Sequence, residues 1–164
     1  MQEPSSNDHN ELLELERFQS ALARRLVFPT QSTEGLALDS IELDRAAETL
    51  VRKRISQTRS LLPESCKLLG NEYRRLFREY AQAHHFDGHR AILHDADRFA
   101  KWLLRELSSD RLKQIASSHL RDALRWEQEI CRARLSRIRI RILRVSNRWR
   151  LVLRFKDRLR IWYF

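Results

Sequence analysis

Glycine and proline are scarce in this sequence, with three residues of each among 164. So few glycines exclude a collagen-like chain and leave no glycine-rich loop that could cradle a phosphate. No apolar run approaches the roughly 18 residues of a membrane-spanning helix. The N-terminus has neither the basic nor the apolar region of a secretory signal. We therefore expect a globular cytoplasmic protein that does not contact a membrane.

Residues typical of catalysis are equally sparse. Cysteine occurs only at Cys66 and Cys131, without the spacing of a metal or redox motif, so we expect reduced, partly buried thiols. No Gly-x-Ser-x-Gly nucleophile motif is present. Asp95 and Asp97 are interpreted as acids at the start of a helix rather than as a general acid–base pair. The sequence predicts that the protein is not an enzyme and has no cofactor.

One segment rich in histidine is the only candidate for a metal site. Such a site needs three or four ligands at bonding distance and supporting second-shell contacts, which a single loop rarely supplies. The Asp87-Gly88 pair is a turn signal, so we expect a solvated loop that binds no metal. His119, on the apolar stripe of a predicted helix, is expected to be a core or boundary histidine. The segment contains His84, His85, His89 and His94, with Asp87, Asp95 and Asp97.

Helical periodicity dominates the sequence up to about residue 133. Leu, Ala, Arg and Glu are abundant there, and apolar residues recur at the spacing of amphipathic helices. Pro63 fits the first position of a short helix that ends at Gly70. A loop at residues 84–93 precedes a helix opened by Asp95, and residues 108–110 cap the last helix. The pattern predicts six helices, at about residues 8–27, 40–62, 63–69, 71–83, 95–107 and 110–133.

From about residue 134, basic and apolar residues alternate instead. Period two is typical of a strand, whose side chains point to opposite faces. Turns at Asn147 and at Lys156-Asp157 divide this tail into three antiparallel strands. So small a sheet is stable only when its apolar face is packed. The predicted fold is α+β: one domain, residues 1–164, with a helical bundle at 8–133 and a basic antiparallel sheet at 134–164 packed on it.

Acidic residues are almost missing from this tail. Residues 132–164 contain twelve Arg or Lys and one acid, Asp157, for a net charge of +11, whereas the whole chain is +10. Rows of like charge on neighbouring strands oppose folding, so the pattern suggests an acidic ligand; a solvated strand face is the alternative. The candidate binding residues are Arg137, Arg139, Arg141, Arg148, Arg150, Arg154, Arg158, Arg160 and Trp162.

The expected orientation of the sheet follows from packing its apolar side on the helices. Ile138, Ile140 and Ile142 would face the bundle, and the arginines would face solvent. Trp162 and Phe164 would share the arginine face, where they could stack on a ligand. The other residues expected to face inward are Trp149, Leu151, Leu153, Phe155, Leu159, Ile161 and Tyr163.

Spaced proline, glycine and aromatic residues form a further pattern over residues 50–127. It consists of Leu50-Val-Arg-Lys-Arg54, Leu62-Pro63, Leu69-Gly70, Tyr73-Arg-Arg-Leu-Phe77-Arg-Glu-Tyr80, Asp95-Ala-Asp-Arg-Phe99-Ala-Lys-Trp102-Leu103 and Ala123-Leu-Arg-Trp126-Glu127. This pattern resembles bacterial helical partner proteins of multinuclear non-haem iron-dependent oxidative enzymes, which act in the maturation of ribosomally made peptides. Such partners are often catalogued as DNA-binding domain proteins.

The resemblance implies an accessory role. The partner binds the enzyme, which holds the iron, and presents the precursor peptide by adding its leader as a strand to a C-terminal sheet. It implies packing roles for Phe77, Tyr80, Phe99 and Trp102. The chain departs from the family pattern at residues 84–88, which replace a proline-rich turn, and in its strongly basic tail.

Two functions fit the basic sheet. The first is a non-catalytic adaptor that binds an iron-dependent oxidative enzyme, its acidic precursor peptide, or both. The alternative is a nucleic-acid-binding protein that uses the same arginines for phosphates and Trp162 for base stacking. Attachment to anionic lipid is disfavoured, because no predicted helix is both strongly basic and broadly apolar.

Overall fold

The computed structural model describes residues 17, 20, 40–84, 90–109, 112, 114–145 and 148–164. The chain divides into two compact units, Met1–Arg52 and Lys53–Phe164. In the first unit the described residues are Arg17, Ser20 and the first part of a helix that begins at Ser40. The helix predicted at residues 8–27 therefore lies largely outside the described part of the chain.

Five helices are described: α2 (Ser40–Leu61), α3 (Pro63–Leu69), α4 (Glu72–Ala83), α5 (Ala91–Glu106) and α6 (Ser118–Leu135). Pro63 begins α3 as predicted, because a missing N–H is harmless at the first helical position. Gly70 ends α3 with a φ of 56°, in the left-handed region that favours glycine. The local signals around these two residues were sufficient to define the short helix.

The predicted starts of the last two helices are wrong. Helix α5 begins at Ala91, so Asp95 and Asp97 lie within it and not at its N-terminus. Helix α6 begins at Ser118, where the Ser117 side chain accepts a hydrogen bond from the backbone N–H of Leu120. Residues 108–110 therefore do not cap α6. Serine is a good helix cap at either place, and sequence alone could not rank the two sites.

The C-terminal tail forms the predicted three-stranded antiparallel sheet, in the order β1-β2-β3. Its strands are β1 (Ile138–Val145), β2 (Arg148–Phe155) and β3 (Arg158–Tyr163). The predicted two-residue turn at Lys156-Asp157 is confirmed, with Lys156 at a φ of 52°. The turn predicted at Asn147 lies outside the described residues. The described chain is thus α+β, with helices followed by a sheet.

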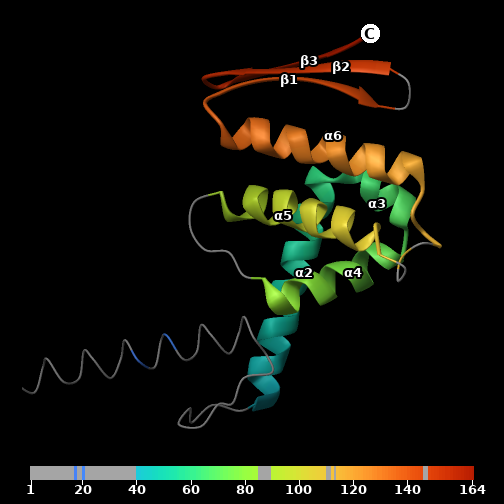
Figure 1. The fold of residues 1–164 in the computed structure, drawn as a ribbon. Coiled ribbons are helices and arrows are strands. Elements are labelled where there is room, and N and C mark those ends of the chain that lie inside the picture. The colour runs from blue at the N-terminus through green and yellow to red at the C-terminus, as the bar shows by residue number, and fades with distance from the viewer. Residues whose placement is uncertain are drawn as a thin grey trace, which may run out of the picture. The chain divides into compact units, whose positions relative to one another are not determined.

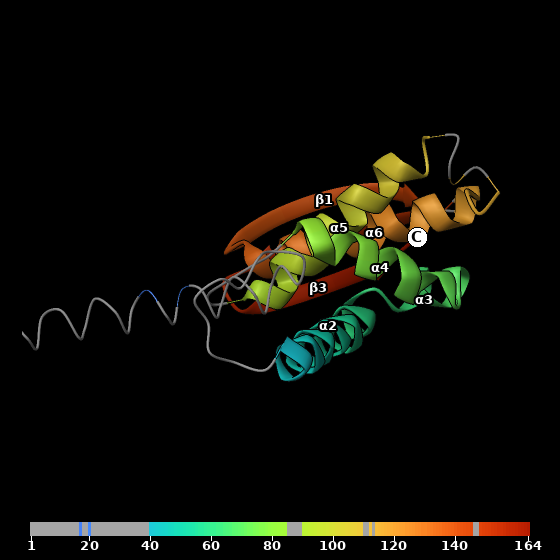
Figure 2. The same cartoon turned by 90° about the horizontal axis from the view of Figure 1, so that it is seen from below.

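The second unit is layered. Figure 1 shows the sheet on one side of α6, with α5 and α3 on the other side of that helix and α4 beyond them. Figure 2 shows α6 running along the sheet between β1 and β3. Helix α6 contacts α3 and α5 as well as β1 and β2. One helix therefore covers one face of the sheet and also packs against the other helices.

Aromatic rings form the core between α4 and α5. Phe99 lies 4.9 Å from Phe77, 5.4 Å from Tyr73 and 5.3 Å from Tyr80 between ring centroids. These four side chains are essentially inaccessible to solvent, and Trp102 stacks on Phe99 at 6.0 Å. The packing roles expected for these positions are confirmed.

Candidate partner-binding surface

A second apolar cluster decides which face of the sheet meets the helices. Trp126 and Ala133 of α6 pack with Val145 of β1 and Val152 of β2, and Leu143, Leu159, Ile130 and Ile161 adjoin them. The odd-numbered residues of β1 and β3 and the even-numbered residues of β2 therefore face α6. We call this side the inner face. For β1 and β2 it is the side that the sequence assigned to solvent, whereas Leu159 and Ile161 of β3 face α6 as predicted.

The predicted orientation of β1 and β2 is wrong. Ile138, Ile140 and Ile142 are exposed to 65%, 64% and 62%, on the side away from α6. Alternation separates the residues of a strand into two sets, but it does not say which set meets a neighbouring layer. The decisive partners lie on α6, which presents an acid and an aromatic ring to the arginines.

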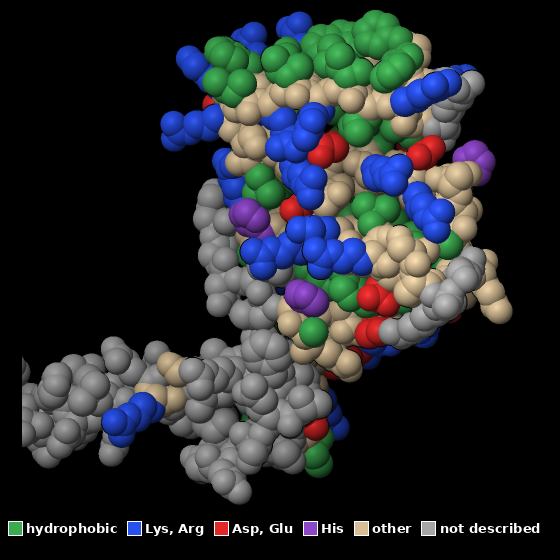
Figure 3. All heavy atoms as spheres, in the orientation of Figure 1, with side chains coloured by type: hydrophobic (Ala, Val, Ile, Leu, Met, Phe, Trp, Pro, Cys, Tyr) green, Lys and Arg blue, Asp and Glu red, His purple; other side chains and the backbone are tan. Residues whose placement is uncertain are grey.

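The outer face of the sheet is apolar over most of its area. Cross-strand register places twelve side chains on it, nine of them apolar and three of them arginine. Figure 3 shows hydrophobic side chains gathered along the exposed side of the sheet, with Lys and Arg at its borders. The outer face comprises Ile138, Ile140, Ile142 and Arg144 of β1, Trp149, Leu151, Leu153 and Phe155 of β2, and Arg158, Arg160, Trp162 and Phe164 on the β3 side.

The direction predicted for β3 is confirmed, with Leu159 and Ile161 toward α6, but its predicted register relative to β1 and β2 is wrong. Ile161 pairs with Val152 and Leu159 with Arg154, so both lie on the inner face. Trp162 pairs with Leu151 and thus shares the isoleucine face. Phe164 exchanges backbone hydrogen bonds with Trp149, which continues the same register. The aromatic residues expected beside the arginine row instead extend the apolar surface.

The candidate binding residues are not brought together on one surface. Arg158, Arg160 and Trp162 lie on the outer face, and Arg137 is exposed just before β1. By register the other five belong to the inner face: Arg139, Arg141, Arg148, Arg150 and Arg154.

Glu129 of α6 neutralises part of the inner arginine row. Its carboxylate accepts hydrogen bonds from Arg139 at 2.8 and 3.1 Å and from Arg132 at 3.1 Å, and Arg141 lies 3.8 Å away. Arg132 also donates to Asp97 at 2.7 Å. Burial alone would lower the pKa of Arg132, but these two acids hold it above its usual range. An acid of the same chain therefore pairs with Arg139 and Arg141, which the sequence had assigned to an external ligand.

Replacing Glu129 with alanine is expected to destabilise the fold by about 1–3 kcal/mol, because partly buried guanidinium donors lose a charged acceptor. Urea unfolding followed by circular dichroism measures this loss. Asp157→Ala is the matched control, since Asp157 is fully exposed and 3.7 Å from Arg154; it should leave the free energy of unfolding nearly unchanged. Equal effects of the two substitutions would contradict the role given to Glu129.

Arg150 is held by aromatic rings. Its guanidinium carbon lies 5.0 Å from the centroid of Trp126 and 5.4 Å from that of Tyr163, both within cation–π range. The Nε atoms of Arg150 and Arg154 are buried and have no hydrogen-bond partner among the described residues. Sequence reasoning missed Trp126 and Glu129 as partners of the arginines because both precede the sheet, on a helix.

Three side chains of the candidate metal segment, those of His84, Asp95 and Asp97, have other partners. The Nδ1 atom of His84 lies 2.9 Å from the carbonyl oxygen of Tyr80, and the two rings stack at 4.4 Å. Asp95 and Asp97 pair with arginines. Within the described ranges no three His, Cys, Asp or Glu side chains are grouped as metal ligands. His85, Asp87 and His89 lie outside the described residues.

Three other predictions concern single side chains. His119 is exposed, so its predicted core or boundary position is wrong; the late start of α6 places it in the first helical turn. Cys66 and Cys131 are both buried and free, and burial raises the pKa of the Cys131 thiol to about 12.

Across the described residues, no helix is both long and apolar enough to cross a membrane.

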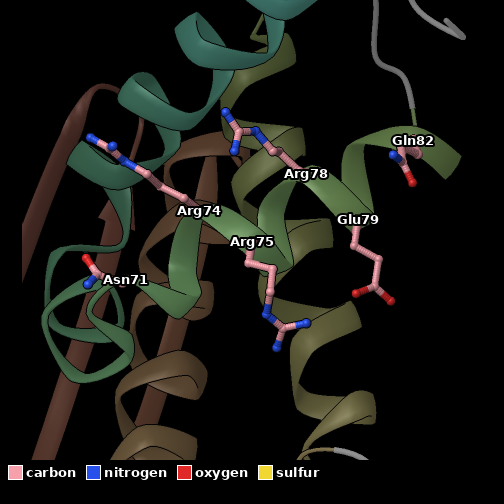
Figure 4. A pocket seen from close by; sticks show the side chains of 6 residues that line it. All are labelled: Asn71, Arg74, Arg75, Arg78, Glu79 and Gln82. Carbon is pink, nitrogen blue, oxygen red and sulfur yellow. The ribbon is translucent and has the colours of Figure 1, made fainter.

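A hollow on α4 is lined by basic and polar residues (Figure 4). The guanidinium groups of Arg74, Arg75 and Arg78 point in different directions there. Arg75 is engaged by Glu72 of its own helix. These side chains do not converge on one ligand. The remaining lining residues are Asn71, Glu79 and Gln82.

A family model described as SCO6045-like, C-terminal domain, matches residues 16–105, more than half of the chain. The chain belongs to this family. Among the described elements, the SCO6045-like match spans α2, α3, α4 and nearly all of α5, so α6 and the sheet lie beyond it. No curated protein and no solved structure gives a significant match.

Proposed function

We propose that this protein is a non-catalytic adaptor that binds a partner protein through the outer face of its C-terminal sheet. The supporting observation is the continuous apolar surface on that face, which no described element covers. By the resemblance in the helical region, the partner is an iron-dependent oxidative enzyme, its precursor peptide, or both.

The argument rests on how sheets are stabilised. The apolar face of a sheet is normally buried against a second layer of structure. Here α6 covers the inner face, while Ile140, Trp149 and Phe155 of the outer face are 64%, 52% and 55% exposed. Burying one such side chain fully contributes about 1.5–3 kcal/mol. Extended exposed apolar surfaces of this kind mark interaction sites.

We assign a binding role to fewer arginines than the sequence suggested. Arg158 and Arg160 border the outer face, and no acid among the described residues pairs with either. Rim ion pairs of this kind contribute about 0–1 kcal/mol each. Apolar burial would therefore supply most of the affinity, and the two arginines would select an acidic partner.

Coexpression with an iron-dependent oxidative enzyme encoded beside the protein tests this proposal. The wild type should copurify with the enzyme in a stoichiometric complex. The double variant Ile140→Glu/Ile142→Glu should reduce the association at least about 100-fold, because two charges would be buried in an apolar interface. Isothermal titration calorimetry measures both affinities.

The matched control is Leu68→Glu, which places the same charge on an exposed leucine of α3, away from the sheet. It should bind like the wild type. Loss of binding in the control as well, or its retention in the double variant, would contradict the proposal. So would tight binding to single-stranded nucleic acid near 150 mM salt with a slope of about −0.7 per phosphate in log affinity against log salt.

A further inference from the structure

We infer that the missing layer over the outer face is a single amphipathic α-helix of the partner, with an apolar stripe flanked by acidic side chains. This inference rests on the proposed function, since it names the chemistry of the partner that would use the same surface.

The dimensions of the sheet favour one helix. Strands β1 and β2 have eight residues each, which corresponds to about 27 Å at 3.4 Å per residue. Helix α6 has 18 residues, or about 27 Å, and covers the inner face along this direction. The outer strands lie about 10 Å apart, close to the diameter of one helix. The outer face has the same extent as the inner one, so a helix of similar length would cover it.

The borders of the outer face indicate where the acids of that helix lie. Arg158 and Arg160 occupy the first half of β3, beside Phe155 and Leu153 of the central strand. These two arginines thus mark one border of the apolar surface. A helix lying along β2 would meet them with acids on the flank that faces β3.

Other occupants fit these observations less well. A second copy of this chain would bring Arg158 and Arg160 against an equally basic surface, in a chain of net charge +10. A peptide added as a strand at the edge of β1 or β3 would pair with backbone groups and leave the apolar face in water. Neither arrangement uses both the apolar area and the positions of the arginines.

Three synthetic 18-residue peptides with the same leucine stripe test the inference. One has glutamates on both flanks, the second has lysines in their place, and the third is the glutamate peptide with a central proline. Fluorescence anisotropy at 150 mM salt measures their affinities for the full-length protein. We expect the glutamate peptide to bind about tenfold more tightly than the lysine peptide. Proline should weaken it about 100-fold, because it breaks the helix.

Two variants and one control separate the contributions. Arg158→Glu/Arg160→Glu should reverse the preference, so that the lysine peptide binds more tightly. Ile140→Glu/Ile142→Glu should abolish binding of all three peptides, and Leu68→Glu should leave every affinity unchanged. Circular dichroism of each variant should match that of the wild type, which excludes loss of fold as the cause.

Several results would overturn the inference. Equal affinity for the acidic and basic peptides removes the charge argument, and equal affinity for the proline peptide shows that the bound peptide is not a continuous helix. Absence of binding at 200 μM peptide, or a dimer in sedimentation that Ile140→Glu/Ile142→Glu dissociates, also overturns it. So does displacement of the acidic peptide by anionic phospholipid vesicles. If the enzyme complex forms and is lost in the Ile140/Ile142 variant while the peptides fail, the adaptor role stands and only the helix is wrong.

Discussion

Replacing Arg54 with alanine is expected to destabilise the second unit by about 3–5 kcal/mol, the typical effect of removing one partner from a buried ion pair. Arg54 donates from Nε and Nη2 to the two carboxylate oxygens of Asp95, at 2.8 and 2.9 Å. The Asp95 side chain is only 3% exposed. Without the guanidinium, its charge would remain buried among aromatic rings.

The same arginine connects three helices. Its Nη2 also donates to the carbonyl oxygen of His84, at the end of α4, at 3.0 Å, while Asp95 lies on α5. The guanidinium carbon lies 5.6 Å from the centroid of Phe77. Loss of Arg54 therefore removes contacts that hold the end of α2 against α4 and α5, in addition to the charge pair.

Urea unfolding at pH 7 measures this effect. Arg75→Ala is the control, because Arg75 pairs with Glu72 on the exposed side of α4 and should contribute no more than about 1 kcal/mol. The double variant Arg54→Met/Asp95→Leu should be more stable than Arg54→Ala, since it leaves no unpaired charge. A loss below about 1 kcal/mol in Arg54→Ala would mean that water reaches Asp95.

Replacing Glu127 with alanine should be comparably damaging, at about 3 kcal/mol or more, because several buried donors lose their acceptor. Glu127 of α6 accepts hydrogen bonds from the backbone N–H groups of Glu64 and Ser65 and from the Ser65 hydroxyl. These groups belong to the first turn of α3, whose own N-cap residue, Leu62, offers no side-chain acceptor. Glu127 thus caps α3 from another helix.

The Glu127 carboxyl also predicts a pH dependence. Burial raises its pKa, and the three hydrogen bonds from α3 offset only part of that rise. The folded state therefore binds this proton more tightly than the unfolded state does. The resulting stabilisation is full below the unfolded value of about 4.3 and is lost as the pH rises through the raised folded pKa.

Unfolding free energies of the wild type and Glu127→Ala at pH 7 measure the first effect, and those of the wild type and Glu127→Gln between pH 4 and 8 measure the second. The wild type should lose stability relative to Glu127→Gln as the pH rises over that window. Glu64→Gln is the control, because its exposed side chain lies at the same helix start and should show neither effect. A Glu127→Ala variant as stable as Glu64→Gln would refute the capping role.

The sequence predicted secondary structure correctly where the bounds of an element depend on adjacent residues. Pro63 and Gly70 define α3, and the alternation around Ile140 with the Lys156-Asp157 turn defines the strands, since each depends on neighbouring residues alone. The prediction of the start of α6 failed because the serines at positions 108, 109 and 117 are all suitable helix caps. The prediction of which face of β1 and β2 meets the helices failed for a different reason. The choice of face depends on Glu129 and Trp126, whose meeting with the arginines is a tertiary contact that no periodicity encodes.

Only one of the two faces of the C-terminal sheet contributes to the stability of the fold, because only that face contacts α6. Positions such as Ile140 and Arg160 point away from α6, while their strand neighbours Arg139 and Ile161 carry the contacts that keep the sheet on the helix. Substitutions on the outer face can therefore change the exposed surface without removing the contacts to α6. Because α6 and the sheet lie beyond residues 16–105, the family match constrains neither of these two faces.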